Sequence, residues 1–168
     1  IASCLVGSEM CIRDRTEGPA VGLADETVAV AELASVLPRA QALVLCCPLD
    51  DSTRGLIGAR QLALMPPGAL LVNVARAEVV DEEALYHALT GGQLGRAALD
   101  VWYSYPKAGQ TPAPPSRWPL HELPNVRGTP HISAITPALL ERRYAFIAHN
   151  TMRVAQGLEP ENVIYRSR

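Results

Sequence analysis

Short apolar runs alternate with segments of helical periodicity from residue 16 to the end of the chain. Three runs, at residues 42–46, 69–74 and 97–102, contain few polar positions, and Val126 marks a fourth, shorter strand. Continuous apolar strands are typical of a parallel sheet, because crossover helices cover both of its faces. The pattern therefore predicts an α/β fold with a parallel sheet.

Helical segments separate these strands and carry signals at their ends. Residues 31–37 and 58–65 predict short helices, and residues 82–90 predict a third helix that Asp81 caps. A long helix is predicted to begin at Thr136, because a proline follows at the first helical position. Residues expected on its packed stripe recur at helical spacing and are Leu140, Tyr144, Ile147, Thr151 and Val154.

Two stretches are predicted to contribute nothing to the core. Residues 1–15 show no clear helical or strand period, and we interpret them as a non-native junction; the alternative is a natural but atypical N-terminal strand. Residues 103–124 contain six prolines, which predicts a long surface loop. We expect residues 16–134 to belong to one domain and residues 135–168 to form its C-terminal helix and tail.

The composition excludes several classes of function. The chain has 168 residues, enough for about one domain, and its net charge of -2 disfavours binding to nucleic acid or to an anionic membrane surface. Its apolar runs are far shorter than the roughly 20 residues that cross a bilayer. Four sparse cysteines without Cys-x-x-Cys spacing disfavour a disulfide framework and a metal site, so we expect a cytoplasmic protein.

Candidate chemistry follows the predicted strands, because ligands of open α/β sheets bind beyond the carboxyl ends of the strands. Each of the segments found there also has a plain structural reading, such as a strand end, a surface charge, a turn cap or a packed loop histidine. No single segment decides a function. The four segments are Cys47-Pro48-Leu49, Ala75-Arg76-Ala77, Asp100-Val101-Trp102 and Thr129-Pro130-His131.

Taken together and in this order, these segments resemble the NAD-binding domain of the D-isomer-specific 2-hydroxyacid dehydrogenases. The resemblance extends over about residues 38–162. It implies an incomplete Rossmann-type parallel sheet with crossover helices and a long C-terminal helix. The blocks that carry it are Cys-Pro-Leu-Asp-Asp-Ser-Thr-Arg-Gly-Leu-Ile, Leu-Met-Pro-Pro-Gly-Ala-Leu-Leu-Val-Asn-Val-Ala-Arg-Ala-Glu-Val-Val-Asp-Glu-Glu-Ala-Leu, Ala-Leu-Asp-Val-Trp and Asn-Val-Arg-Gly-Thr-Pro-His-Ile-Ser.

The resemblance also implies roles for single residues. Arg76 matches the family's substrate clamp, since a guanidinium holds a carboxylate with two parallel donors. His131 matches the general acid and base, and Asp100 matches the aspartate that faces the nicotinamide carboxamide. The implied whole enzyme is a homodimer that acts on a small 2-hydroxy or 2-oxo acid. Its cofactor, NAD or NADP, is expected to lie against Cys47, Pro48, Val74, Ala75, Arg76, Asp100, His131 and Ala134.

The chain departs from the family in two places. The Gly-x-Gly-x-x-Gly pattern that binds a pyrophosphate does not occur in it. We therefore expect the chain to be the C-terminal part of the dinucleotide-binding domain, to bind a dinucleotide weakly and to show no hydride transfer of its own. The residues from 135 onward are then expected to return toward a missing substrate domain. The family's usual acid stands before a proline, 29 positions after the arginine, and here Tyr105 occupies that position. Tyr105 is therefore the third catalytic candidate, as an uncharged partner of His131.

Three alternatives stay open at this point. One is a specialised branch similar to the formate dehydrogenases, which carry a neutral glutamine at the position of Tyr105. Another is a dinucleotide-sensing corepressor that shares the fold and performs no catalysis. The third is a chain without activity.

Overall fold

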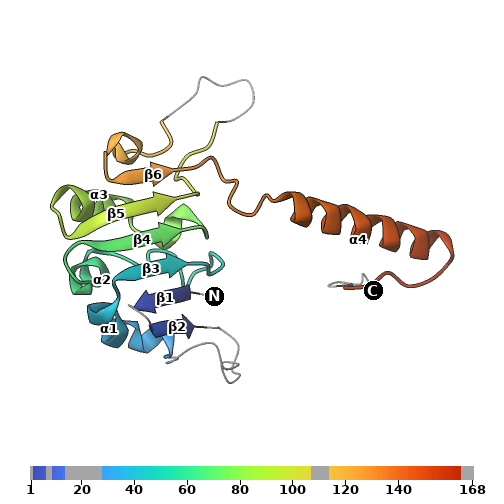
Figure 1. The fold of residues 1–168 in the computed structure, drawn as a ribbon, viewed down its shortest axis with the longest axis horizontal. Helices are drawn as coiled ribbons and strands as arrows, with labels where there is room; N and C mark the ends of the chain where they lie inside the picture. Colours follow the sequence, from blue (N-terminus) through green and yellow to red (C-terminus); the bar gives the residue numbers. More distant parts are fainter. Residues whose placement is uncertain (1, 7–8, 14–27, 107–113, 164–168) are drawn as a thin grey trace. The chain divides into compact units, whose positions relative to one another are not determined.

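The computed structural model describes residues 2–6, 9–13, 28–106 and 114–163 (Figure 1). The chain divides into two compact units, residues 1–131 and 132–168. The first unit is built on a six-stranded sheet with the order β2-β1-β3-β4-β5-β6. Its strands are β1 (Ala2–Val6), β2 (Glu9–Arg13), β3 (Ala42–Leu45), β4 (Ala69–Asn73), β5 (Leu94–Leu99) and β6 (Val126–Gly128). Its helices are η1 (Val30–Glu32), α1 (Leu33–Val36), η2 (Leu37–Arg39), α2 (Ala59–Leu64), η3 (Ala77–Val79), α3 (Glu82–Thr90) and η4 (Leu120–Glu122).

The four strands from β3 to β6 run parallel, each beside the next in the chain. Leu45 pairs with Asn73, which pairs on its other side with Leu99. Leu99 in turn pairs with Gly128. The last residues of all four strands therefore form one row across the sheet, with neighbours about 5 Å apart.

The hydrophobic core lies on one face of this sheet. Alternate residues of β3 and β4 are buried, while the residues between them, such as Val44 and Leu70, are only half-buried. The apolar runs had predicted that helices cover both faces of the sheet. In the described residues the core cluster lies on one face, where the apolar side chains of α2 and α3 pack. The buried contributors include Leu43, Leu45, Leu62, Leu71, Leu85, Leu89, Leu94 and Leu99.

The N-terminal segment differs from the preferred expectation, because residues 2–6 and 9–13 form two strands, where the alternative interpretation had a single N-terminal strand. β1 pairs antiparallel with both β2 and β3, with Val6 opposite Glu9 and Ala2 opposite Leu45. A sequence signal for this hairpin was overlooked: Gly7-Ser8 is a dipeptide of the kind that joins two hairpin strands. The strands do not test whether the segment is native, so that interpretation stays a prediction.

The predicted start and end of α3 agree with the structure, whereas the helix predicted over residues 31–37 is divided into η1, α1 and η2. Asp81 caps α3, since its carboxylate accepts a hydrogen bond of 2.8 Å from the amide of Ala84. The helix ends at Gly91, and Gly92 follows in the left-handed region with φ 78°. β5 covers Leu94–Leu99 and lies three residues earlier than the predicted run 97–102, because its pairing with β4 begins at Leu94 and ends at Leu99.

The second unit is the helix α4 (Pro137–Ala155) with the tail that follows it. The hydroxyl of Thr136 caps the helix by accepting from the amide of Leu139 at 3.1 Å. The tail folds back, because the side-chain amide of Asn150 exchanges two hydrogen bonds, of 2.9 and 3.2 Å, with the backbone of Glu161. Among the described residues, no helix combines the length and the apolar character that crossing a membrane requires.

Gly95→Ala is expected to destabilise the first unit by about 1–3 kcal/mol, the usual cost of overpacking. A Cβ at this position meets the carbonyl oxygen of Gly68 at 2.5 Å, and backbone atoms cannot move aside as a flexible side chain does. Urea denaturation followed by tryptophan fluorescence measures the free energy of unfolding. Gly58→Ala is the control, because the nearest atom to its Cβ lies 3.6 Å away; equal losses in both variants contradict the steric argument.

Candidate active site

The candidate site begins where the aligned strands end, and backbone hydrogen bonds extend the sheet by one step. The amide of Val74 donates to Leu45 at 3.2 Å, and that of Asp100 donates to Asn73 at 3.0 Å. The amide of Thr129 donates to Leu99 at 3.0 Å. The segments that follow β4, β5 and β6 are therefore fixed to the end of the neighbouring strand and leave the sheet side by side.

A tight turn after β4 presents Arg76 to solvent. Asn73, which is 1% exposed, holds this turn with both ends of its amide: Oδ1 accepts from the amide of Ala75 at 3.0 Å, and Nδ2 donates to the carbonyl of Arg76 at 2.9 Å. The guanidinium Nη1 donates to the carbonyl of Ala75 at 2.6 Å. Burial alternates along the turn, so that Ala75 and Ala77 face the core while Val74 and Arg76 are exposed.

A second polar pair joins the ends of β5 and β6. Asp100 is 4% exposed, and its Oδ1 accepts a short hydrogen bond from the hydroxyl of Thr129. The carbonyl of Thr129 accepts from the indole Nε1 of Trp102 at 3.0 Å. Because a buried carboxylate is stabilised by such donors, this pair fixes both the aspartate and the chain that leads to His131.

His131 contacts Tyr105, as the sequence predicted. The phenolic oxygen lies 3.3 Å from Nδ1 of His131, and it also accepts from the backbone amide of Trp102 at 3.0 Å. When the hydroxyl donates to Nδ1, the neutral imidazole carries its hydrogen on Nε2. His131 also has φ 59°, an uncommon conformation for a residue with a side chain, so the local structure holds it against a conformational cost.

The loop after β3 is held by a threonine that the sequence analysis did not identify. Thr53 is buried, and its hydroxyl donates to the carbonyl of Pro48 at 2.7 Å. The same oxygen accepts from the amide of Asp50 at 2.8 Å. This arrangement fixes Pro48 beyond the end of β3 and keeps Cys47 buried.

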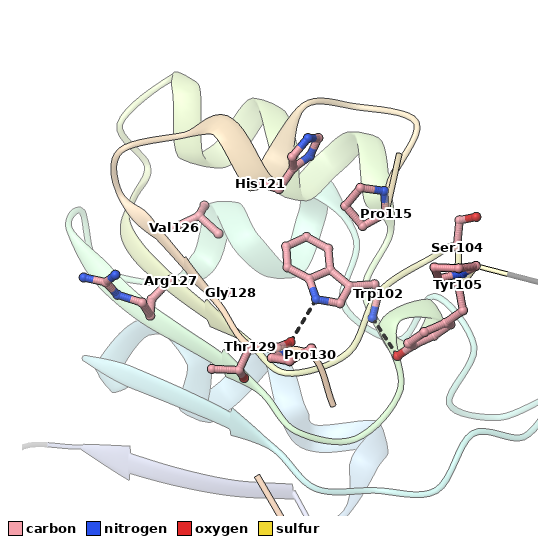
Figure 2. A pocket seen from close by; sticks show the side chains of 11 residues that line it. Trp102, Ser104, Tyr105, Pro115, His121, Val126, Arg127, Gly128, Thr129 and Pro130 are labelled. Carbon is pink, nitrogen blue, oxygen red and sulfur yellow. Dashed lines mark hydrogen bonds between the residues drawn. The ribbon is translucent and has the colours of Figure 1, made fainter. Parts of the chain in front are cut away.

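A pocket of 680 Å³ opens beside Tyr105 at the β6 edge of the sheet (Figure 2). The indole of Trp102 lines the pocket and packs directly against Gly128. A side chain at position 128 would clash with the indole, because its Cβ would lie 2.5 Å from the ring. Thr129 and Pro130 line the pocket on the side of the chain that leads to His131.

Residues 3–133 match the family described as D-isomer specific 2-hydroxyacid dehydrogenase, NAD binding domain. The chain belongs to this family. The chain is 38% identical over 135 residues to D-3-phosphoglycerate dehydrogenase of Methanocaldococcus jannaschii, covering 80% of this chain and 24% of the relative. It is 36% identical to glyoxylate/hydroxypyruvate reductase B of Pectobacterium atrosepticum, covering 79% of this chain and 39% of the relative. The chain thus spans well under half the length of these curated relatives.

Solved structures show the same relationship. A D-isomer specific 2-hydroxyacid dehydrogenase from Xanthobacter autotrophicus Py2, in complex with NADPH and MES, superposes with a TM-score of 0.70 at 32% identity, over 92% of this chain and 60% of that one. D-lactate dehydrogenase with NAD+ from Lactobacillus jensenii gives 0.76 at 29% identity, over 93% and 48%. The predicted Rossmann-type α/β fold of this dehydrogenase domain is confirmed.

Within the dehydrogenase domain, some of the predicted site residues are in direct contact and others only lie along the same edge of the sheet. Tyr105 and His131 are in direct contact, whereas Arg76 and Asp100 share with them the aligned edge of the sheet. Ala134 belongs to the second unit, and its cofactor contact stays a prediction. Asn73 is a functional residue without a predicted role, although a polar residue at the end of an apolar strand was a usable signal.

Asn73→Asp is expected to destabilise the domain by about 1–3 kcal/mol, the cost of burying unsatisfied polar groups. The carboxylate still accepts from Ala75 but no longer donates to the carbonyl of Arg76, so two acceptors face each other in a buried place. Urea denaturation at neutral pH measures the loss. A variant as stable as the parent contradicts the bracing role of Asn73.

Proposed function

We propose that this chain carries the catalytic edge of an oxidoreductase that interconverts a 2-hydroxy acid and a 2-oxo acid with NAD or NADP. The observation that carries the proposal is the Tyr105–His131 contact on the same sheet edge that presents Arg76. Membership of the dehydrogenase family supports it. The names of the relatives supply candidate substrates, namely glyoxylate and hydroxypyruvate.

Arg76 is the proposed clamp for the substrate carboxylate. Its guanidinium is exposed at the end of a turn that Asn73 braces from inside, so the backbone beneath it is fixed. A planar guanidinium holds a carboxylate with two donors and polarises the neighbouring carbonyl, which a lysine ammonium does not do in the same geometry.

His131 is the proposed general acid and base, acting through Nε2. In reduction it donates a proton to the 2-oxo oxygen, and in oxidation it accepts the proton of the alcohol. Tyr105 holds Nδ1 on the other side of the ring. When the ring acts as a base its hydrogen is on Nδ1, which donates to the phenolic oxygen, and the imidazolium donates to the same oxygen.

The residues at the sheet edge fit a nicotinamide cofactor. Val74 is 36% exposed although it directly follows a buried strand, which offers an apolar surface to a flat ring. The buried carboxylate of Asp100 suits the amino group of a carboxamide, and Cys47, Pro48 and Ala75 complete the proposed lining. The cofactor supplies or accepts the hydride. NADPH and NAD+ are both named among the related structures, and we propose NAD or NADP without choosing between them.

The uncharged partner of His131 favours a second candidate. A branch similar to the formate dehydrogenases uses a neutral residue at this position, as the resemblance implies. Formate oxidation with NAD+ is therefore a further assay for the same protein. If the protein oxidises formate and does not reduce 2-oxo acids, formate oxidation replaces the interconversion of 2-hydroxy and 2-oxo acids as its proposed function.

We also propose the organisation of the whole enzyme. Residues 16–134 form part of the dinucleotide-binding domain, and residues 135–168 return toward a substrate domain. The exposed apolar side chains of α4, which need a partner surface, support this course. The enzyme is a cytoplasmic homodimer in this proposal, in line with the sparse cysteines and the family resemblance. The exposed residues are Tyr144, Ile147, Met152 and Val154.

The test is a chimera in which residues 42–131 replace the matching segment of the Pectobacterium atrosepticum reductase. We expect it to oxidise NADH or NADPH with glyoxylate or hydroxypyruvate, and Arg76→Lys is expected to lower kcat/KM by about 10²-fold. The reason is that an ammonium does not hold a carboxylate and the adjacent carbonyl in register.

Arg60→Lys in the chimera is the matched control, because Arg60 is an exposed arginine of α2. This exchange is expected to leave kcat/KM near the parental value. Near-parental activity of Arg76→Lys excludes the clamp role, and a folded chimera without turnover on either 2-oxo acid excludes the proposed function.

Tyr105→Phe in the chimera is expected to lower kcat/KM by up to about tenfold, since one hydrogen bond contributes about 0.5–1.5 kcal/mol. Tyr105→Glu is expected to move the limb at which His131 loses its proton to higher pH, because a carboxylate stabilises the imidazolium. Profiles of kcat/KM against pH measure both effects. Three identical profiles remove Tyr105 from the mechanism.

A further inference from the structure

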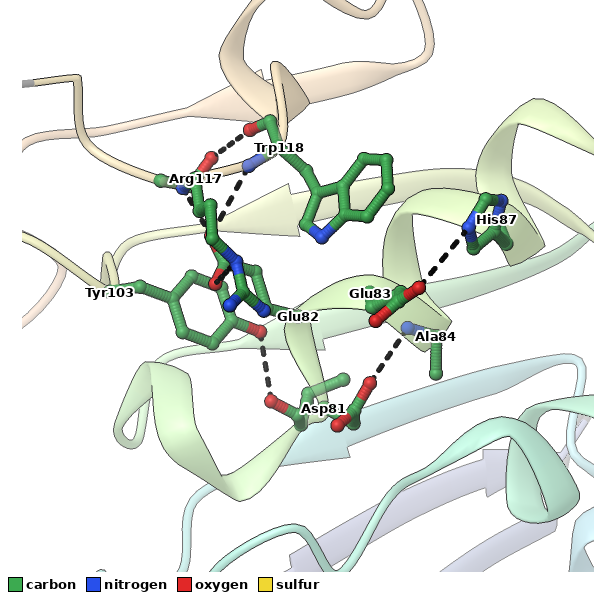
Figure 3. A network of polar contacts seen from close by, with 10 residues as sticks. Asp81, Glu82, Glu83, Ala84, His87, Tyr103, Arg117 and Trp118 are labelled. Atoms are coloured by element: carbon green, nitrogen blue, oxygen red, sulfur yellow. Dashed lines mark hydrogen bonds and ion pairs between the residues drawn. The ribbon is translucent and has the colours of Figure 1, made fainter.

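Tyr105 lies on a loop whose position needs an explanation. Its side chain is 47% exposed, so burial of the ring does not fix it. The loop leaves the sheet after Asp100 and returns to it through η4, and the structure describes its two flanks, residues 103–106 and 114–119. Both flanks are tied to the start of α3 (Figure 3).

The first flank is tied through Tyr103. Its hydroxyl donates to the carbonyl of Val80 at 2.9 Å, one residue before the cap of α3. Burial, together with the negative charges of Glu82 and Asp81, raises the pKa of Tyr103 far above the usual value of a tyrosine. The phenol therefore stays protonated and keeps donating at neutral pH.

The second flank is tied through the carboxylate of Glu82. Its Oε1 accepts from the backbone amide of Arg117 at 2.5 Å and more loosely from that of Trp118 at 3.4 Å. Its Oε2 lies 3.9 Å from the guanidinium of Arg117. The side chain of Glu82 is only 14% exposed, and the indole of Trp118 stacks on Tyr86 one turn further along α3, with ring centres 4.9 Å apart.

The anchor itself is rigid, and the two flanks are joined to each other. Ile57 pairs with the segment before α3, donating to Val79 at 3.0 Å and accepting from Asp81 at 2.9 Å. The amide of Ser104 donates to the carbonyl of Pro115 at 2.9 Å. Glu82 is therefore linked to Ser104, directly before Tyr105, through one hydrogen bond from Arg117, the backbone back to Pro115, and one hydrogen bond from Ser104 to Pro115.

We propose that Glu82 is a positioning residue of the active site. Its carboxylate holds residues 115–118, these hold Ser104, and the phenol of Tyr105 is thereby kept on Nδ1 of His131. The catalytic consequence rests on the proposed function, whereas the positioning itself is a property of this chain. Asp81, directly before Glu82, caps the helix, so the two neighbouring carboxylates have separate tasks.

The test uses the 168-residue chain and records the ¹⁵N signal of Nδ1 in His131 by NMR. This signal responds to the hydrogen bond between Nδ1 and the hydroxyl of Tyr105, whichever of the two atoms donates, so Tyr105→Phe provides the reference change. Glu82→Ala is expected to shift the signal as Tyr105→Phe does, and the double variant is expected to shift it no further. Glu82→Gln is expected to retain the parental signal, because its amide oxygen still accepts from Arg117.

Glu83→Ala is the matched control. Glu83 occupies the same helical turn, is 58% exposed and pairs only loosely with His87 at 3.9 Å. Its removal is expected to leave the His131 signal unchanged. If Glu82→Ala changes the backbone signals of the whole sheet, Glu82→Ser replaces it, since serine suits the first turn of a helix and is too short to reach Arg117.

Two outcomes overturn the proposal. In the first, the amide signals of Arg117 and Trp118 change in Glu82→Ala while His131 keeps its parental signal, so that the carboxylate anchors only its own flank. In the second, both Glu82→Ala and Glu82→Ser unfold the chain, which makes Glu82 a folding residue.

Activity separates this proposal from the proposed function. In the chimera, Glu82→Ala is expected to lower kcat by the same factor as Tyr105→Phe and to leave the KM for NADH unchanged. If Tyr105→Phe has no effect on turnover while the His131 signal responds to Glu82→Ala, the positioning stands and the catalytic role of Tyr105 is wrong.

Discussion

The candidate site depends on backbone hydrogen bonds that continue beyond the ends of the parallel strands and fix the segments that follow them. The amides of Val74, Asp100 and Thr129 each bond to the last carbonyl of the strand beside them. A parallel ladder requires a fixed register, and here the register places four strand ends in one row. Residues that are far apart in the sequence therefore leave the sheet at neighbouring points with fixed directions.

Buried polar side chains turn this row into a site with a definite shape. Asn73 closes the turn that presents Arg76, and the bond between Thr129 and Asp100 joins the last two strand ends. Thr53 does the same for the loop that holds Pro48. Buried groups of this kind destabilise the fold if a partner is lost, so each of them forces the backbone around it into one arrangement.

The contact between Tyr105 and His131 shows how an uncharged residue takes the place of an acid. A carboxylate only accepts hydrogen bonds, and its charge favours the imidazolium. A phenol stays neutral and either donates or accepts, so it orients the ring without adding a charge. Its orientation then depends on the loop that carries it, which explains why anchors at Val80 and Glu82 bear on the site.

Local signals in the sequence determined the elements of this protein. The apolar runs predicted the parallel strands, and Asp81 and Thr136 predicted two helix starts, because each effect acts within a few residues. The prediction that the proline-rich residues 103–124 contribute nothing to the core was wrong, since Leu120 in η4 is fully buried in the core cluster and Trp118 packs against it. The family resemblance pointed to Arg76, His131 and Tyr105, and the structure shows the last two in contact.

The tertiary structure decided which distant groups meet. The hydrogen bonds between the Arg117 amide and Glu82 and between Thr129 and Asp100 join residues 35 and 29 positions apart, and no local pattern encodes them. The antiparallel pairing of β1 with β3 is likewise a contact between remote segments, whereas the hairpin of β1 and β2 had a local signal in Gly7-Ser8. Caps, turns and periodicity are set by neighbours in the chain, whereas these contacts form only after the sheet has brought remote segments together.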